Sequence, residues 1–353
     1  DVNLECKNTV KSYVCNLKKI NMRKIKFLIP IATLFVVIFS CNNDDDGVIV
    51  VPPHERSDEV IVAKEEVEEY LETHFYNYEE FENPPNDFNY RILFDTISGE
   101  NSSKTPLMSQ VTFKMVTDLI DESVEYKLYY LNVRQGDGER AEFSDLATVS
   151  YDGSILKDND SFDSSISPIT FDLTQIIKGL QKAIIEFNGA TGFTENSDGT
   201  LTFDDYGIGA AFIPSGLGYY NTPPIGSPIE YYAQLIFTFH LYSIEKSDQD
   251  LDTVLSSFED LNDNGNELDD DTDANGIPNF ADPDDDGDGR LTKHEVEAKE
   301  YQLNPGDADP EFEENEVEMQ RKTNDETGVV TLYTVVFTDA NNDGVPDYLD
   351  NTL

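Results

Sequence analysis

The sequence predicts an α+β fold in which an antiparallel sheet is wrapped around a short helix. In AQLIFTFHLYSI, residues 233–244, large apolar side chains alternate with polar ones, which is typical of a strand with one buried face. Ile236 interrupts that alternation. In TQIIKGLQKAI, residues 174–184, apolar side chains recur at helical spacing, and Thr174 is placed to cap the helix. A single short helix among several strands is most economically buried inside a curved sheet.

The composition is strongly acidic and still compatible with a folded core. The 353 residues include 71 Asp and Glu but only 24 Lys and Arg, which gives a net charge of −47. Such a charge repels phosphate backbones, so we expect no nucleic-acid partner. Hydrophobic residues make up 38% of the chain, which is enough to build a core rather than a disordered acidic chain. The length predicts two or three domains.

The first 56 residues are not expected to join the fold. Residues 22–40 have a basic start and an apolar run shorter than the roughly 20 residues that span a membrane, which is typical of a secretory signal. With Cys41 they resemble the lipobox of bacterial lipoproteins, which implies a lipid anchor on Cys41 and an outer-membrane location in the cell envelope. An ordinary signal peptide with an incidental cysteine is the alternative. Residues 1–21 are interpreted as an upstream extension and residues 41–56 as an acidic tether.

Residues 57–142 are predicted to be an accessory region without chemistry of its own. Ser57 is expected to cap a helix whose apolar stripe runs from Val60 to Phe75. After the helix-breaking segment NPPNDF, two strand-like runs begin at Val111 and Glu125. This region is expected to lead into the next domain.

Four sequence blocks in residues 143–246 carry a family resemblance. They are VSYDGSILKDNDSFDSS (149–165), PITFDLTQIIKGLQKAI (168–184), FIPSGLGYY (212–220) and QLIFTFHL (234–241). In order and spacing they resemble the FK506-binding-protein family of peptidyl-prolyl cis-trans isomerases. The resemblance implies that family's sheet-and-helix fold and catalysis without a cofactor.

The same resemblance implies a pocket for a proline ring. Ile177 would offer its backbone N–H to a substrate carbonyl, and Tyr219 would point its hydroxyl into the pocket. Leu180 stands where the family has a tryptophan, Ile169 replaces a wall aromatic, and a longer connection with an expected hairpin fills residues 186–210. The implied pocket residues are Tyr151, Phe162, Asp163, Ile176, Ile177, Leu180, Tyr219 and Phe237.

Proline isomerisation explains why these residue types would suffice. Rotation about an X-Pro bond is slow because amide resonance must be broken, with a barrier of about 20 kcal/mol. An apolar aromatic cavity disfavours the polar planar amide, and hydrogen bonds near the twisted carbonyl lower the barrier. The same aromatics could instead form plain core, so a folded but inactive domain is the alternative. The four histidines are too scattered for a zinc site.

Residues 251–353 are predicted to bind calcium through repeated acidic loops. DPDDDGDGRLTKHE, residues 282–295, contains a full EF-hand loop pattern with a glycine at the sixth place, and the following residues are expected to form an exiting helix. Its predicted ligands are Asp284, Asp286, Asp288, Arg290 and Glu295.

Three degenerate copies of that loop pattern follow the same spacing. The first runs through Asp260, Asn262 and Asn264 to Asp271; the second through Asp271, Asp273 and Asn275 to Asp282; the third through Asp339, Asn341 and Asp343 to Asp350. Consecutive loops of this kind resemble thrombospondin type 3 repeats, which implies structural Ca²⁺ rather than sensing. A solvated acidic tail without metal is the alternative.

We therefore expect an envelope lipoprotein whose peptidyl-prolyl isomerase domain assists the folding or assembly of envelope or surface proteins. Its partners would be proline-containing polypeptide clients and, through Cys41, a membrane. Two alternatives are a chaperone or binding module of the same fold without turnover, and a calcium-stiffened structural or adhesive surface protein. The oligomeric state is not indicated by the sequence.

Overall fold

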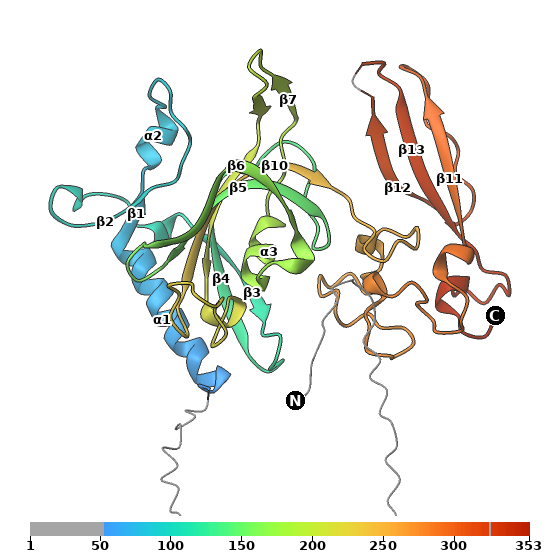
Figure 1. Ribbon diagram of the computed structural model, residues 1–353, viewed down its shortest axis with the longest axis horizontal. Helices are drawn as coiled ribbons and strands as arrows, with labels where there is room; N and C mark the ends of the chain where they lie inside the picture. Colours follow the sequence, from blue (N-terminus) through green and yellow to red (C-terminus); the bar gives the residue numbers. More distant parts are fainter. Residues whose placement is uncertain (1–52, 325) are drawn as a thin grey trace, which may run out of the picture. The chain divides into compact units, whose positions relative to one another are not determined.

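The computed structural model describes residues 53–324 and 326–353, so the predicted signal segment and Cys41 lie outside the described residues. The main sheet comprises β3 (Thr112–Thr117), β4 (Glu125–Arg134), β5 (Leu146–Ile155), β6 (Ser161–Asp172), β9 (Gly207–Ile213) and β10 (Leu235–Glu245). Its strand order is β3-β4-β9-β10-β5-β6, with every neighbouring pair antiparallel (Figure 1). The α+β class with an antiparallel sheet is confirmed.

The concave face of the sheet packs against α3 (Lys178–Ile184), as Figure 1 shows. Leu180, Ala183 and Ile184 of this helix join Phe237 and Phe239 of β10 in one buried cluster. The predicted alternation in β10 is therefore confirmed, because one set of its side chains faces the helix. Burial of these side chains removes large apolar areas from water and is the main source of stability on this face.

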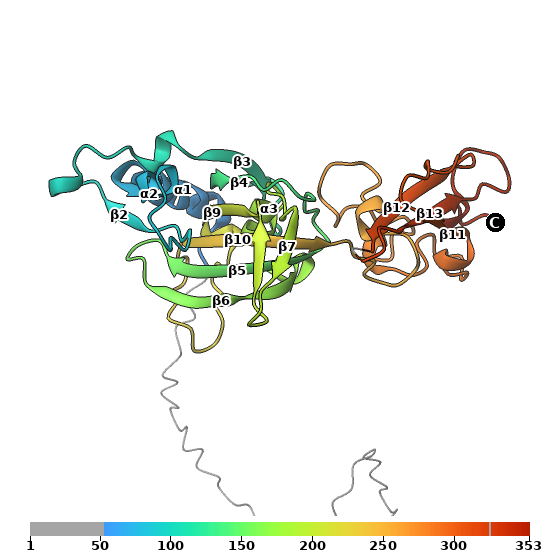
Figure 2. The ribbon, with the colours of Figure 1, turned by 90° about the horizontal axis from the view of Figure 1, so that it is seen from above.

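The opposite face of the sheet is covered by α1 (Arg56–Thr73). Val67 and Leu71 of α1 pack with Phe212 of β9 and with Ile236, which is fully buried. Ile236 breaks the alternation of β10 because the strand is buried on both faces where α1 lies. Figure 2 shows β9, β10, β5 and β6 side by side in the main sheet.

Both predicted helix caps are wrong. Helix α1 begins at Arg56 with Glu55 as its N-cap residue, so Ser57 lies inside the first turn. Arg56 fixes this start because its guanidinium pairs with Asp118. Before α3 the carboxylate of Asp172 accepts the N–H of Thr174 at 2.9 Å, which holds a separate 3₁₀ turn. Helix α3 therefore starts later, with Ile177 rather than Thr174 as its N-cap residue.

The region expected to be accessory contributes strands to the main sheet. The two runs predicted from Val111 and Glu125 are strands β3 and β4, and β4 pairs with β9. The boundary expected at residue 143 therefore falls inside this sheet. The smaller elements before it are β1 (His74–Tyr76), α2 (Tyr78–Glu82) and β2 (Phe94–Thr96), with β1 paired to β2.

A hairpin forms the long connection between α3 and β9, as its turn sequence predicts. Its strands are β7 (Gly192–Glu195) and β8 (Leu201–Asp204), which pair antiparallel. The N–H of Gly199 bonds the carbonyl of Asn196 at 2.9 Å in the turn, where Gly199 has a φ of +82°.

The C-terminal region combines acidic loops with a second sheet that the sequence does not predict. Its strands are β11 (Val296–Leu303), β12 (Glu316–Thr323) and β13 (Val330–Phe337), in the order β11-β13-β12. The prediction of a helix leaving the loop at Glu295 is wrong. A short 3₁₀ turn (Thr292–His294) lies just before Glu295, and strand β11 begins directly after it. Pairing with β13 along the full length of β11 satisfies the backbone there instead. Among the described residues, no helix is long and apolar enough to cross a bilayer.

Candidate functional site

The centre of the predicted proline pocket lies where β5 pairs with β6. Gly153 of β5 stands opposite Asp163 of β6, and the hydroxyl of Tyr151 donates a hydrogen bond to the Asp163 carboxylate at 2.7 Å. Asp163 is exposed, whereas Tyr151 is half-buried. Burial, followed by the hydrogen bond to Asp163, raises the pKa of the Tyr151 hydroxyl. Tyr151 is therefore held as a neutral donor beside a carboxylate that faces solvent.

Two phenylalanines stand at right angles beside this pair. The ring centroids of Phe162 and Phe237 lie 5.6 Å apart with an interplanar angle of 76°, and Tyr151 stacks on Phe237 at 6.2 Å. Gly153 makes room for them, because a Cβ at this position would lie 2.9 Å from a ring carbon of each phenylalanine. The absence of a side chain at Gly153 thus allows both rings to approach the strand.

Phe171 is a wall residue that sequence reasoning missed. Its ring lies 5.1 Å from that of Tyr151, and it packs half-buried against the core. Ile169, two residues earlier on β6, pairs with Val149 and is also half-buried. Residues i and i+2 of a strand point to the same face, so the aromatic expected at residue 169 could have been sought at residue 171.

The start of α3 supplies the other side of the pocket. Ile176 and Ile177 are half-buried and pack against the core, while Leu180 lies one turn inside and is 3% exposed. Ile177 has an extended backbone, and its carbonyl accepts the N–H of Leu180 at 3.0 Å. Its own N–H makes no hydrogen bond to any residue of 53–324 or 326–353. An amide at a helix N-terminus is thus left available for an acceptor.

Tyr219 extends the pocket from the loop after β9. It is half-buried against the same core. Burial, followed by the charge of Asp163, raises the pKa of its hydroxyl. The structure thus brings the apolar predicted residues into one cluster, with the Tyr151–Asp163 hydrogen bond beside it. Such a site can desolvate a proline ring while donating hydrogen bonds to the adjacent amide.

The four acidic loops share one hydrogen-bond scheme. In each loop the N–H of the glycine at the sixth place bonds the carboxylate of the first aspartate, at 2.8 to 3.1 Å. These glycines have φ values from +71° to +94°, a left-handed conformation that other residues rarely adopt. The four pairs are Gly265 with Asp260, Gly276 with Asp271, Gly289 with Asp284, and Gly344 with Asp339.

The loop of residues 284–295 gathers its carboxylates most closely. One oxygen from each of Asp284, Asp286 and Asp288 lies within 4.8 Å of the others. Glu295 is buried, and burial together with the charges of Asp286 and Asp288 raises its pKa to about 7. The guanidinium of Arg290 lies 3.6 Å from a Glu295 oxygen.

The degenerate loops close in the same way, with one change from the sequence prediction. Asn275 bonds Asp282 at 2.7 Å and Asn341 bonds Asp350 at 2.8 Å, as their spacing predicts. In the first loop, however, Asn262 bonds Asp270 at 3.0 Å. Asn264 of the same loop bonds Asp269 at 3.0 Å, so neither of these two amides bonds Asp271. Asp271 is engaged instead by Gly276 of the second loop.

The first acidic loop is bonded to the pocket helix, which the sequence did not indicate. The carboxylate of Glu267 lies 3.1 Å from the amine of Lys178 and 3.4 Å from that of Lys182, both on α3. Lys182 also donates a hydrogen bond to the carbonyl of Gly265. Burial outweighs the Glu267 charge and lowers the pKa of Lys182 to about 8. Burial alone would raise the pKa of Glu267, but the two lysines lower it.

Comparisons with known proteins match two parts of the chain. Residues 249–326 match a family model described as BamM C-terminal. The chain is similar to the crystal structure of a peptidyl-prolyl cis-trans isomerase from Pseudomonas syringae pv. tomato, with 15% identity and a TM-score of 0.31, over 56% of this chain and 100% of that one. It is also similar to FkpA from Escherichia coli, with 18% identity and a TM-score of 0.29, over 54% of this chain and 62% of that one. For the three FKBP domains of wheat FKBP73 the identity is 16% and the TM-score 0.28, over 38% of this chain and 52% of that one.

Proposed function

We propose that the main sheet and α3 form a peptidyl-prolyl cis-trans isomerase. The observation that carries this proposal is the Tyr151–Asp163 hydrogen bond of 2.7 Å, set against the rings of Phe162, Phe171 and Phe237. A plain core has no need of an exposed carboxylate that orients a half-buried tyrosine at the edge of an aromatic cluster. The four sequence blocks that resemble the FK506-binding-protein family supply the same residues.

In the proposed reaction the chain's own groups act on the X-Pro amide without forming a covalent bond. The rings surround the proline and remove water, which disfavours the dipolar planar amide. The free N–H of Ile177 holds a substrate carbonyl, and the hydroxyl of Tyr151, oriented by Asp163, supplies a second polar group. Contacts that are stronger with the twisted amide than with the planar one lower the barrier.

The test is catalysed cis–trans exchange of a short peptide with an apolar residue before proline, followed by NMR exchange spectroscopy with the full chain. Asp163→Asn keeps the side-chain shape but removes the charge that orients Tyr151. Since a hydrogen bond to a charged group is worth about 1.5 kcal/mol or more, we expect exchange roughly tenfold slower. Asp204→Asn in β8 is the matched control, because Asp204 is equally exposed and lies on the hairpin. Equal rates for both variants would remove Asp163 from the mechanism.

The same peptide separates an isomerase from a binding module. Chemical-shift changes at the pocket without faster exchange would indicate a chaperone or binding module that retains the groove. The proposed clients in either case are proline-containing polypeptides. The buried side chain of Leu180 offers a smaller contact surface to a proline ring than an aromatic ring would. We therefore expect a measurable but modest rate enhancement.

We also propose that the four acidic loops bind Ca²⁺ and that the metal stiffens the C-terminal region. The residues fit such an ion: buried oxygens of Asp286, Glu295 and Asp270 have no hydrogen-bond partner among the described residues. Oxygen ligands at alternate positions around a left-handed glycine are what Ca²⁺ requires. Limited proteolysis of the full chain should cut residues 260–295 in excess chelator and spare them in calcium. Identical digestion in both conditions would dismiss this proposal.

We further propose an envelope lipoprotein anchored through Cys41. This rests on the basic start, the apolar run and the cysteine of residues 22–41. Several acyl chains on one cysteine give stable membrane binding. The substitution Cys41→Ala should abolish lipid labelling in a bacterial host and release the protein from membranes. Equal membrane retention, with no label on the wild type, would contradict the anchor.

A further inference from the structure

Three carboxylates from two separate segments meet in the interior of the C-terminal region. Asp252, Glu259 and Asp285 are 0%, 2% and 1% exposed, and one oxygen from each lies within 4.8 Å of the others. Asp252 and Glu259 belong to the segment that follows β10, whereas Asp285 belongs to the loop that starts at Asp284. We call these three residues the buried triad.

The buried triad presents oxygens that nothing in the described chain satisfies. Both carboxylate oxygens of Glu259, one of Asp252 and one of Asp285 make no hydrogen bond within the described residues. The remaining oxygens are anchored, since Asp252 accepts the N–H of Val254 at 2.8 Å and Asp285 accepts the hydroxyl of Thr292 at 2.6 Å. Each aspartate is thus anchored by one oxygen and keeps its other oxygen unpaired within the described residues.

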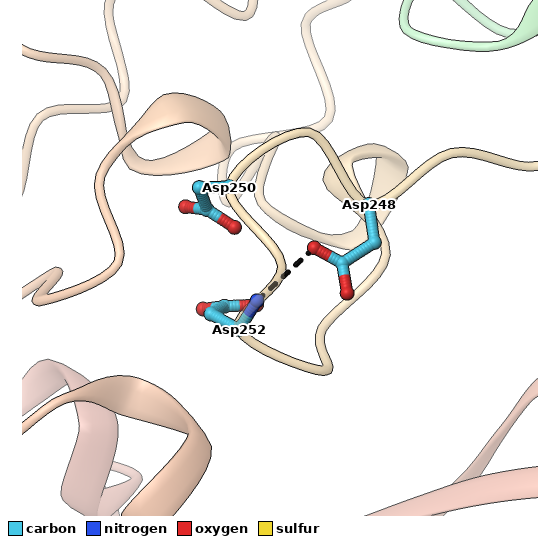
Figure 3. A group of neighbouring side chains, drawn as sticks. All are labelled: Asp248, Asp250 and Asp252. Carbon is cyan, nitrogen blue, oxygen red and sulfur yellow. Dashed lines mark hydrogen bonds between the residues drawn. The ribbon is translucent and has the colours of Figure 1, made fainter.

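A neighbouring turn is built to hold Asp252 in this position. Figure 3 shows Asp248 bonded to the backbone N–H of Asp252, at 3.1 Å, and the same carboxylate also accepts the N–H groups of Leu251 and Thr253. Leu251 and Thr253 have φ values of +66° and +93°, a strained conformation for non-glycine residues and especially for a β-branched threonine. Asp250 lies in the same turn, close to Asp248 and Asp252, and both of its oxygens are unpaired within the described residues.

No basic side chain compensates these charges. Within residues 53–324 and 326–353, no lysine or arginine forms an ion pair with a member of the buried triad or with Asp250. Burying a charged carboxylate without a partner costs free energy, and three carboxylates close enough to bind one ion repel each other. We propose that the buried triad is a cation site, with Asp250 at its rim.

The geometry favours calcium over other common cations. The ligands are all oxygens, which suits Ca²⁺ and Mg²⁺ rather than zinc, whose sites are dominated by sulfur and nitrogen. Ca²⁺–oxygen distances of about 2.3–2.6 Å place opposite ligands up to roughly 5 Å apart, which accommodates the spacing of the buried triad. Mg²⁺ needs a tighter octahedron and retains several waters, which a fully buried group of carboxylates does not supply.

This site is separate from the four loops proposed above. Asp285 occupies the second place of its loop, between the ligand positions of Asp284 and Asp286, and points to Asp252 and Glu259 instead. None of the triad residues is a predicted loop ligand, so the inference does not depend on occupancy of those loops. A cation here would join residues 252–259 to the loop of residues 284–295.

The test counts calcium ions bound to the full chain. In equilibrium dialysis against calcium chloride, Glu259→Gln should bind one ion fewer per chain than the wild type, because a neutral amide replaces the central ligand. The surface variant Glu297→Gln on β11 should bind the wild-type number. Asp343→Asn, in the loop of residues 339–350, should also bind one ion fewer, because it weakens a loop site. An unchanged ion count for Asp343→Asn would count against that loop and not against the buried triad. An unchanged ion count for Glu259→Gln at saturating calcium would overturn the proposal.

Thermal unfolding separates a cation site from a merely structural role. In excess chelator, Glu259→Gln should melt at or above the wild-type temperature, because it removes one of three repelling charges. In calcium it should melt below the wild type, because it has lost a bound ion. Asp252→Asn should show the same crossing. A decrease of equal size in both conditions would mean that Glu259 supports packing alone, and the cation site would be excluded.

Discussion

The contact between Glu267 and helix α3 gives a prediction whose size follows from burial. The side chain of Glu267 is 5% exposed, and those of Lys178 and Lys182 are 9% and 8% exposed. The substitution Glu267→Gln preserves the shape but leaves two lysine charges without their carboxylate. Removing one partner of a buried ion pair costs about 3–5 kcal/mol, because the other charge stays buried. We expect the free energy of unfolding to fall by about that amount at pH 7.

The loss should depend on pH because burial lowers the pKa of Lys182 to about 8. Below that pH Lys182 is charged in the folded wild type, and the Glu267 carboxylate compensates this buried charge. Above it, folded Lys182 is neutral, whereas in the unfolded chain it stays protonated up to its ordinary pKa of about 10.4. The folded state then binds fewer protons than the unfolded one, so this group contributes stability as the pH rises. The difference between Glu267→Gln and wild type should therefore shrink as the pH rises through 8.

Urea denaturation of the full chain in saturating calcium, at pH 7 and pH 9, measures both effects. Glu297→Gln is the exposed control and should change the unfolding free energy by less than about 0.5 kcal/mol. Adding Lys182→Met to Glu267→Gln should restore part of the loss at pH 7, because an apolar side chain can be buried without a partner. A loss below about 1 kcal/mol at pH 7 would be typical of a screened surface pair and would refute the argument from burial.

Three further outcomes follow from the pocket and the loops. Phe171→Leu should slow peptide exchange roughly two- to tenfold in the NMR assay, since an aromatic pair such as Phe171–Tyr151 is worth about 0.5–1.5 kcal/mol; an unchanged rate would place Phe171 outside the pocket. Gly153→Ala should also lower the rate, because the new methyl group meets Phe162 and Phe237 at 2.9 Å, whereas Gly192→Ala, with open space around it, should not. Asp284→Ala should weaken calcium protection of residues 260–295 against proteolysis, and full protection in that variant would count against the loop as a calcium site.

Local patterns predicted those elements whose reasons are local. Alternation identified β10, and the turn sequence around Gly199 identified the β7–β8 hairpin. The single exception in β10, Ile236, could not be interpreted because the cover on the second face comes from α1, far away in sequence. The cap of α1 failed for the same reason, since Arg56 pairs with Asp118, far away in sequence. The cap of α3 failed for a local reason, because Asp172 holds Thr174 in a separate 3₁₀ turn.

The same difference between local patterns and contacts of distant residues applies to the sites. Repeated spacing indicated the acidic loops, because each loop is a continuous segment whose glycine needs a left-handed backbone. The buried triad was missed, because its carboxylates come from two separate segments, residues 252–259 and the loop that starts at Asp284, and only folding brings them together. The prediction of a helix after Glu295 was wrong because pairing with β13 decides the conformation of β11.

We propose that this aromatic cluster catalyses proline isomerisation. The most direct measurement is the cis–trans exchange rate of an X-Pro peptide with the full wild-type chain, with and without FK506 as a competitor for the pocket. We expect exchange faster than the uncatalysed background, proportional to protein concentration and suppressed by FK506. A folded chain that leaves the exchange at the background rate and does not bind FK506 would contradict it.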